Sequence, residues 1–234
     1  MREECGADRV GRPDRGHDDG VVRLPYTDRA EAGRVLAARL DHLRGQHVVV
    51  LGLPRGGVPV AAEIAAALDA PLDVLVVRKL GLPWQPELAM GAVASGDVRV
   101  LNTDVLAAAN VSTEDLEAVT ERELRELRRR EQAYRGGRLP VPLADAVVVL
   151  VDDGLATGAS AAAAIQAARA HKPAAVVLAV PVGAAEIVRK LSALADEVVC
   201  AATPARLLAV GRHYADFAEV PDAEVRRLLG SHGR

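Results

Sequence analysis

Residues 147–160 read VVVLVDDGLATGAS, and this stretch decides the fold that we expect for the chain. Its first five residues are apolar and four of them are valine, which is typical of a strand buried on both faces in a parallel sheet. Two carboxylates, Asp152 and Asp153, follow at the carboxyl end of that strand. Because ligands of open α/β sheets bind at this edge, the sequence predicts a ligand site there.

Small residues follow the acidic pair and lead into an alanine-rich helix. Free N–H groups at a helix amino terminus favour an anion, and glycine and alanine let backbone amides close around phosphate oxygens. Hydroxyl groups in the loop add donors, while paired carboxylates accept hydrogen bonds from vicinal ribose hydroxyls. The pattern therefore indicates a sugar phosphate as ligand, bound by a loop of Gly154, Leu155, Ala156, Thr157, Gly158, Ala159 and Ser160.

The same stretch resembles the phosphoribosyl pyrophosphate (PRPP) motif of type I phosphoribosyltransferases, and its DDxLATG form is most similar to the adenine phosphoribosyltransferases. Two alternatives stay open. Acidic pairs also end a buried strand in phosphoacceptor receiver domains, although there the strand is the first and no TG loop follows; a loop of this composition can also be purely structural. A Walker P-loop is not supported because the lysine of GxxxxGK(S/T) is absent, and a dinucleotide fold is not supported because no GxGxxG follows any predicted strand.

Length and charge set further limits. The 234 residues suit one α/β domain, which we assign to residues 21–234, behind a tail at residues 1–20 that we expect to be disordered. A net charge of −3 and a pI near 6.1 argue against a nucleic-acid partner. We find no signal-peptide core, membrane span or Cys/His metal pattern, so we expect a cytoplasmic protein with no membrane partner.

Strand and helix patterns alternate along the chain and predict a doubly wound parallel sheet of the α/β class. Strands are expected at residues 47–53, 72–77, 147–151, 175–182 and 197–201, and helices at residues 28–43, 58–68, 159–171 and 184–194. Residues 80–98, rich in Gly and Pro, predict a flexible lid and a short hairpin that leads into residues 98–101.

Two further segments are predicted around this sheet. A capping box at Ser112 and Asp115 begins a long charged helix that reaches about Tyr134. Its charges predict a solvated face with i,i+4 pairs, and a partner surface is the alternative. Residues 203–229 are expected to form a small C-terminal hood over the sheet edge.

Candidate site residues follow three predicted strands and meet at one edge of the sheet. Arg55, Gly56 and Gly57 follow the first strand, Lys79 follows the second, and the acidic pair follows the third. The PRGG turn suits a pyrophosphate, because its glycines permit close backbone approach and its arginine offers a bidentate fork; an ordinary tight turn is the alternative. PRGG also resembles the family's pyrophosphate loop, and RKLG at residues 78–81 resembles the segment that directs a lysine toward the same group.

The resemblance implies a reaction and a role for each element. A nitrogenous base attacks ribose C1 of PRPP and displaces magnesium-bound pyrophosphate, whose charge Mg²⁺, Arg55 and Lys79 would neutralise. Asp152 and Asp153 would hold the ribose hydroxyls, place negative charge near the ring, and contact Mg²⁺ mostly through PRPP. It also implies a non-proline cis peptide, by position the bond from Pro54 to Arg55.

The general base and the acceptor are not identified by the sequence. Purine-salvage relatives with a loop aspartate have it where this chain has Ala156, so Glu87 is the candidate substitute, with a solvated lid residue as the alternative interpretation. Trp84, Tyr214 and Phe217 are the aromatic candidates for stacking on a base. A non-catalytic PRPP- or nucleotide-binding regulatory module is the alternative function, and a homodimer is an assembly that we leave open.

Overall fold

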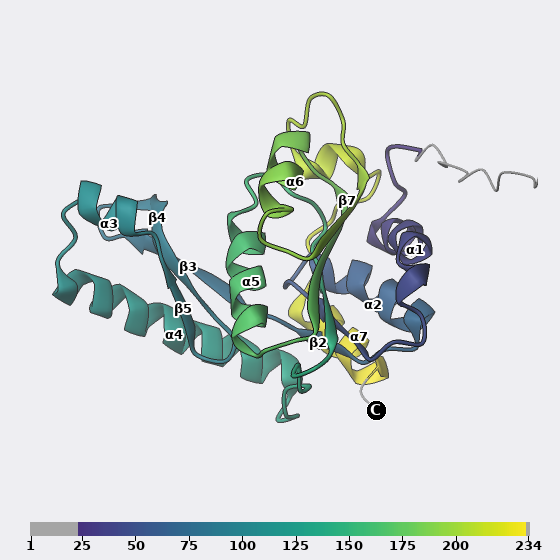
Figure 1. Ribbon diagram of the computed structural model, residues 1–234, viewed down its shortest axis with the longest axis horizontal. Coiled ribbons are helices and arrows are strands. Elements are labelled where there is room, and N and C mark those ends of the chain that lie inside the picture. The colour runs from purple at the N-terminus through teal and green to yellow at the C-terminus, as the bar shows by residue number, and fades with distance from the viewer. Residues whose placement is uncertain (1–22, 233–234) are drawn as a thin grey trace, which may run out of the picture.

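The structure is a computed structural model, which describes residues 23–232, apart from the side chain of His232 (Figure 1). The tail predicted at residues 1–20 lies outside this range. Within residues 23–232, no helix has both the length and the apolar composition that a membrane crossing requires.

The larger sheet is parallel throughout, with the strand order β2-β1-β6-β7-β8 (Figure 1). Its strands are β1 (Val48–Gly52), β2 (Leu72–Val74), β6 (Val147–Val151), β7 (Ala175–Val182) and β8 (Glu197–Ala202). Every residue of β1 is buried, as in strands that helices cover on both faces. The doubly wound α/β sheet predicted from the sequence is confirmed.

Helices pack on both faces of this sheet and form two apolar cores. Alternate residues of β1 point to opposite sides, so that Val48 and Val50 join one core while Val49 and Leu51 join the other. The first core contains residues of α1 (Arg29–Arg39), α2 (Gly57–Leu68) and α7 (Asp222–His232), and the second contains residues of α5 (Ala159–Ala170) and α6 (Ala185–Leu191). Asp28 caps α1 by accepting from the Glu31 N–H, and the predicted helix ends in a short 3-10 turn, η1 (Asp41–Leu43).

The second predicted strand ends earlier than expected. The sequence predicts a strand to Val77, but β2 stops at Val74, which pairs with Gly52, the last residue of β1. One more bond joins the two segments, from the Leu75 N–H to the Gly52 carbonyl (3.2 Å), and β1 then ends. The chain instead turns out of the sheet, where the Val76 N–H donates to Ser95 Oγ (2.9 Å) and the Ser95 N–H donates to the Val76 carbonyl (3.0 Å).

The segment predicted as a loop with a short hairpin is a longer, ordered antiparallel sheet. Its strands are β3 (Val77–Leu82), β4 (Gln85–Ala94) and β5 (Val98–Leu101), with Pro83 and Trp84 as the turn between the first two. Together with α3 (Thr103–Ala108) they form an arm, residues 77–108, that extends away from the parallel sheet (Figure 1). Its flexibility stays a prediction.

The long charged helix, α4 (Thr113–Arg135), lies along the arm (Figure 1). The Ser112 hydroxyl oxygen accepts from the Asp115 N–H, so the predicted amino-terminal cap is confirmed, and Gly136 ends the helix in a left-handed conformation. Pairs at i,i+4 are present as expected, between Glu121 and Arg125, Glu126 and Arg130, and Glu131 and Arg135. Other charges join the helix to the arm, through the pairs Arg78–Glu123, Arg99–Glu117 and Arg128–Asp97.

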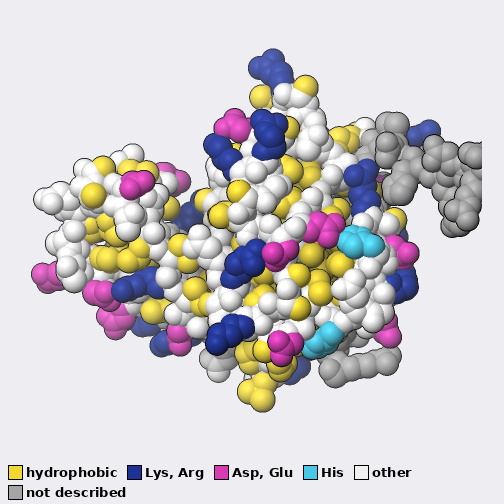
Figure 2. Space-filling model, viewed as in Figure 1, with side chains coloured by type: hydrophobic (Ala, Val, Ile, Leu, Met, Phe, Trp, Pro, Cys, Tyr) yellow, Lys and Arg dark blue, Asp and Glu magenta, His cyan; other side chains and the backbone are white. Residues whose placement is uncertain are grey.

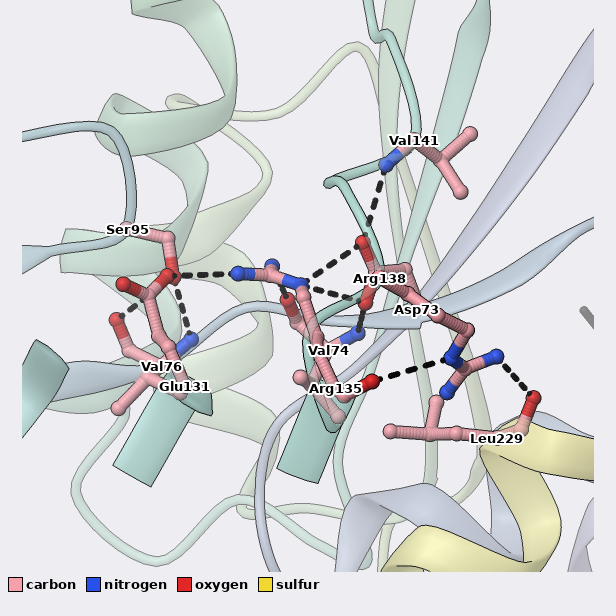
Figure 3. A network of polar contacts seen from close by, with 9 residues as sticks. All are labelled: Asp73, Val74, Val76, Ser95, Glu131, Arg135, Arg138, Val141 and Leu229. Carbon is pink, nitrogen blue, oxygen red and sulfur yellow. Dashed lines mark hydrogen bonds and ion pairs between the residues drawn. The ribbon is translucent and has the colours of Figure 1, made fainter. Parts of the chain in front are cut away.

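A buried ion pair fixes the C-terminal end of α4 to the parallel sheet (Figure 3). Arg135 Nε donates to Asp73 Oδ1 (2.9 Å), and its terminal NH2 nitrogen donates to the Val74 carbonyl (2.8 Å). The Val141 N–H donates to the other Asp73 oxygen (3.1 Å). Since the arm begins just beyond β2, this network holds the base of the arm, α4 and the segment before β6 together.

Removing one partner of this pair is expected to destabilise the domain. Arg135→Met or Asp73→Asn should lower the free energy of unfolding by about 3–5 kcal/mol, because each leaves an uncompensated buried group. Arg125→Met on the exposed face of the same helix is the control and should change it by less than about 1 kcal/mol. Urea denaturation measures both, and equal losses in Arg135→Met and the control would contradict the assigned role.

Candidate active site

Asp152 and Asp153 lie directly after β6, at the carboxyl edge where the sequence places them. The Asp153 N–H donates to Asp152 Oδ1 (2.9 Å), and Asp153 Oδ2 accepts from Arg29 Nε (2.9 Å). Burial raises the pKa of both carboxyls; the charge of Asp153 raises the pKa of Asp152 further, whereas Arg29 acts to lower that of Asp153. The two carboxylates are thus partly desolvated, and a cation or hydroxyl donors would stabilise their negative charge.

The PRGG turn after β1 touches this acidic pair. The bond from Pro54 to Arg55 is cis, so that prediction is confirmed. A Cβ atom on Gly56 would overlap Asp153 Oδ2, and a Cβ atom on Gly57 would overlap the Val151 carbonyl oxygen. Position 57 therefore requires glycine, because the obstacle is backbone, whereas a side chain at position 56 would displace the Asp153 carboxylate.

The side chain of Arg55 is engaged by carboxylates from the C-terminal part of the chain. It forms ion pairs with Glu219 and, at 3.5 Å, with Asp222 Oδ1, which also accepts from the Tyr134 hydroxyl (3.3 Å). In this arrangement the guanidinium is not free to meet a pyrophosphate. The N–H groups of Arg55 and Gly56, however, have no acceptor within residues 23–232.

The loop after the acidic pair presents open N–H groups at the start of α5. Leu155 is buried and anchors the loop, because its N–H donates to the Val182 carbonyl (2.8 Å). Gly158 occupies the capping position with a φ of 73°, and a Cβ atom there would lie 2.6 Å from Ile187 Cγ2. Among the described residues, no acceptor pairs with the N–H groups of residues 156–160. This geometry suits a phosphate group.

Lys79 lies on the arm, near the start of α5, rather than at the end of a parallel strand. It does not follow a parallel strand, because β2 ends at Val74; it lies within β3, opposite Ala92 of β4. Its exposed side chain lines a cavity of about 350 Å³ together with Ala159 and Ala162 of α5. The prediction that Lys79 follows a strand of the parallel sheet is wrong. The lysine nevertheless shares a cavity with α5, the helix that follows the phosphate loop.

Trp84 and Glu87 lie at the outer end of the arm, and the structure does not bring them to the acidic pair. Trp84 is 59% exposed and lines a cavity of about 550 Å³ with Leu88 and Val105. Glu87 lies exposed in β4. Figure 2 shows apolar side chains on the arm, in the same view as Figure 1. The stacking role predicted for Trp84 and the general-base role predicted for Glu87 therefore require the arm to move.

The predicted hood is present in part. The segment after β8, residues 203–221 with the short helix η2 (Val210–His213), passes over the acidic loop: a Cβ atom on Gly154 would lie 2.6 Å from Val210 Cγ1. α7 packs instead against α2 and α4. The Tyr214 hydroxyl donates to the Asp153 carbonyl (2.7 Å), and its ring is buried between Tyr26 and Phe217. Tyr214 therefore cannot stack on a base, whereas Phe217 remains 36% exposed.

Three site residues were missed by sequence reasoning: Arg29, Glu219 and Asp222. Arg29 meets Asp153 across 124 positions, and Arg55 meets Glu219 and Asp222 across 164 and 167 positions. The local patterns around these residues indicate only a capped helix start and a polar loop. No spacing rule within one element could have joined them to the acidic pair or to the PRGG turn.

A parallel sheet with an acidic pair, a glycine turn and an open helix start at its carboxyl edge defines a protein of the type I phosphoribosyltransferase class. The family model "Phosphoribosyl transferase domain" matches residues 27–202, and the chain belongs to this family. That range includes the PRGG turn, the arm and the acidic pair, but not the C-terminal segment that contacts Arg55.

Known proteins support this assignment. "Putative phosphoribosyl transferase Rv0571c" of Mycobacterium tuberculosis (strain H37Rv) is 56% identical over 204 residues, which make up 87% of this chain and 46% of that protein. The same values hold for "Putative phosphoribosyl transferase MT0597" of strain CDC 1551. The chain thus spans about half the length of these relatives. The crystal structure of TT1426 from Thermus thermophilus is 44% identical, with a TM-score of 0.80, over 89% of this chain and 99% of that one.

Proposed function

We propose that this domain binds Mg-PRPP and transfers its 5-phosphoribosyl group to a nitrogenous base, with release of pyrophosphate. One observation carries the proposal: the PRGG turn touches Asp153, beside a helix start whose N–H groups are open. Membership of the phosphoribosyl transferase domain family supports it.

The proposed binding mode uses backbone groups for both phosphate ends of PRPP. The 5-phosphate accepts from the N–H groups of residues 156–160, and Thr157 and Ser160 add hydroxyl donors. The ribose hydroxyls donate to Asp152 and Asp153. The pyrophosphate meets the open N–H groups of the PRGG turn and Lys79, and Arg55 joins them only after it leaves Glu219 and Asp222.

The chemistry of the donor set fits magnesium held jointly with the substrate. Within residues 23–232, no group of three or more His, Cys, Asp and Glu side chains is placed to hold a metal ion alone. Mg²⁺ prefers oxygen ligands and commonly takes one or two carboxylates together with substrate phosphates. Asp152 and Asp153 would contribute in this way, mostly through the PRPP oxygens. When bound, Mg²⁺ neutralises charge on the departing pyrophosphate.

In the reaction, a nitrogen of the base forms a bond to ribose C1 while the bond from C1 to the pyrophosphate oxygen breaks. The electron pair of that bond leaves with pyrophosphate, so positive charge develops on the ring. Asp152 and Asp153 stabilise this charge. Ala156 supplies no carboxylate, so we assign the proton on the base nitrogen to Glu87, which requires the arm to close.

A screen of nucleobases with magnesium and PRPP, monitored for pyrophosphate release, tests this function. We expect at least one base to support release, and Asp153→Asn to suppress it. If no nucleobase supports pyrophosphate release, the transferase function is rejected. If PRPP also fails to bind, the proposed binding site is rejected as well. The net charge of −3 argues against a nucleic-acid partner, and we place the proposed reaction in cytoplasmic nucleotide metabolism. Light scattering decides whether a homodimer forms.

Closure of the arm separates the enzyme from the regulatory module. An enzyme must exclude water from the cationic sugar, so residues 80–96 should be mobile without ligand and ordered with it. We expect the fluorescence of Trp84, the single tryptophan of the chain, to change on addition of PRPP with magnesium. Deleting residues 83–86 should lower turnover far more than PRPP affinity. If the deletion leaves pyrophosphate release intact, the regulatory module becomes the better account.

A further inference from the structure

Arg29, the first residue of α1, reaches the acidic pair and is held there by several contacts. Its Nε donates to Asp153 Oδ2 (2.9 Å), and its NH1 nitrogen donates to the Ala218 carbonyl (2.9 Å). The guanidinium carbon lies 3.9 Å from the ring centroid of Phe217 and 5.9 Å from that of Tyr214. The side chain is only 11% exposed, so Arg29 is a fixed part of the site.

The contact distinguishes the two carboxylates of the pair. Asp153 is bound by the arginine through Oδ2, whereas Asp152, among residues 23–232, accepts only the N–H of its neighbour through Oδ1. Because the ion pair uses one oxygen, Asp153 keeps Oδ1 as an acceptor for a ligand hydroxyl. The other side of the same guanidinium donates to the Ala218 carbonyl of the C-terminal segment, and the Tyr214 hydroxyl of that segment donates to the backbone carbonyl of Asp153.

The planar shape of the guanidinium matters for this arrangement. It stacks on an aromatic ring while it donates in its own plane to a carboxylate and to a carbonyl, which an ammonium group cannot do at once. Net stabilisation of the fold does not by itself explain why Arg29 is paired with Asp153, since partly buried ion pairs contribute little net stability.

We propose that Arg29 is a positioning residue that holds the Asp153 carboxylate in the orientation that accepts a ribose hydroxyl, without itself touching the substrate. The C-terminal segment, residues 214–222, completes this role by holding the guanidinium. The proposal rests on the proposed function for the identity of the ligand, but the orientation of Asp153 can be measured without it.

Kinetic comparison of Arg29→Gln and Arg29→Lys tests the role. We expect Arg29→Gln to lower kcat/KM for PRPP by about 10- to 100-fold, the range for a lost charged hydrogen bond, while KM for the base stays unchanged. Arg29→Lys should recover only part of the loss. Arg34→Gln is the matched control on the same helix, where the side chain is 60% exposed, and should stay within about twofold. A purely structural role would lower the melting temperature but leave kcat/KM per folded molecule unchanged, and that result would overturn the proposal.

Crystal structures of the free wild type and of Arg29→Gln provide the second readout. We expect Asp153 to change its side-chain rotamer in the variant while Asp152 keeps its own. An unchanged Asp153 carboxylate in the variant would overturn the proposal. A wild type that does not bind PRPP would defeat the proposed function, whereas this comparison would still decide the role of Arg29.

Discussion

Pyrophosphate release from Mg-PRPP is expected to fall by about 100- to 1000-fold in Asp152→Asn, because the variant loses a charge that stabilises the cationic sugar. The carboxylate lies at the desolvated edge of the sheet, where such a charge acts most strongly. Asn keeps the size of the side chain and its hydrogen-bonding carbonyl. The loss therefore measures the charge together with the one acceptor oxygen that Asn replaces by an NH2 group.

The same variant should make the free protein more stable. Burial, and then the charge of Asp153, raise the pKa of Asp152 in the folded state, whereas in the unfolded chain it is about 3.9. Between these values the folded protein binds more protons than the unfolded one, so stability falls as the pH rises toward the folded pKa. Asp152→Asn removes this loss. The Tm of the variant should exceed that of the wild type at pH 8, by about 2–4 °C for each kcal/mol gained in the free energy of unfolding. The difference should be smaller at pH 4.5.

Scanning calorimetry in the presence of EDTA measures this gain. Asp41→Asn, whose side chain is 68% exposed, is the control and should leave the pH dependence of the Tm unchanged. A Tm of Asp152→Asn at or below that of the wild type at pH 8 would show that the carboxylate is not destabilising in the free protein.

Gly56→Ala is expected to lower PRPP turnover by about 100-fold or more, the effect of a displacement of about 1 Å at a reacting site. The added Cβ would overlap Asp153 Oδ2, the oxygen that Arg29 binds. Gly56 has a φ of −61° and a ψ of −34°, which alanine adopts freely, so backbone strain does not contribute. The displaced group is a side chain, and we therefore expect most of the stability to remain.

Gly230→Ala in α7 is the matched control, because no atom lies within 4 Å of its added Cβ. It should retain full turnover and equal or slightly higher stability. A Gly56→Ala variant with more than half of the wild-type turnover would contradict the close contact between the PRGG turn and the acidic pair.

The sequence predicts the central strands and the acidic edge well, because β1, β6 and β7 are long apolar runs that only a sheet covered on both faces can bury. The end of β2 could not be predicted in the same way. It is set by the length of β1, a neighbour in space, and the course of the chain through Lys79 follows from it. The strands of the arm could not be predicted from local sequence either, because Pro86 and Gly91 have low strand propensity. These two residues lie in β4 because β3 and β5 pair with that strand.

The polar contacts of the site were the least predictable part. Asp152 and Asp153 are adjacent in sequence and end a strand, so a motif reveals them. The residues that hold the site in place, Arg29 and the pair Glu219 and Asp222, come from opposite ends of the described chain. Such contacts depend on how α1 and the C-terminal segment pack, and no local pattern encodes that packing.

Calorimetric titration of PRPP into the wild type, with and without magnesium, tests whether Asp152, Asp153 and the loop after them form a PRPP site. We expect saturable binding to one site per chain that magnesium strengthens and that Asp153→Asn weakens by about tenfold or more. If neither PRPP nor nucleoside 5-monophosphates bind at millimolar concentration, the carboxyl edge of this sheet is not a phosphoribosyl site.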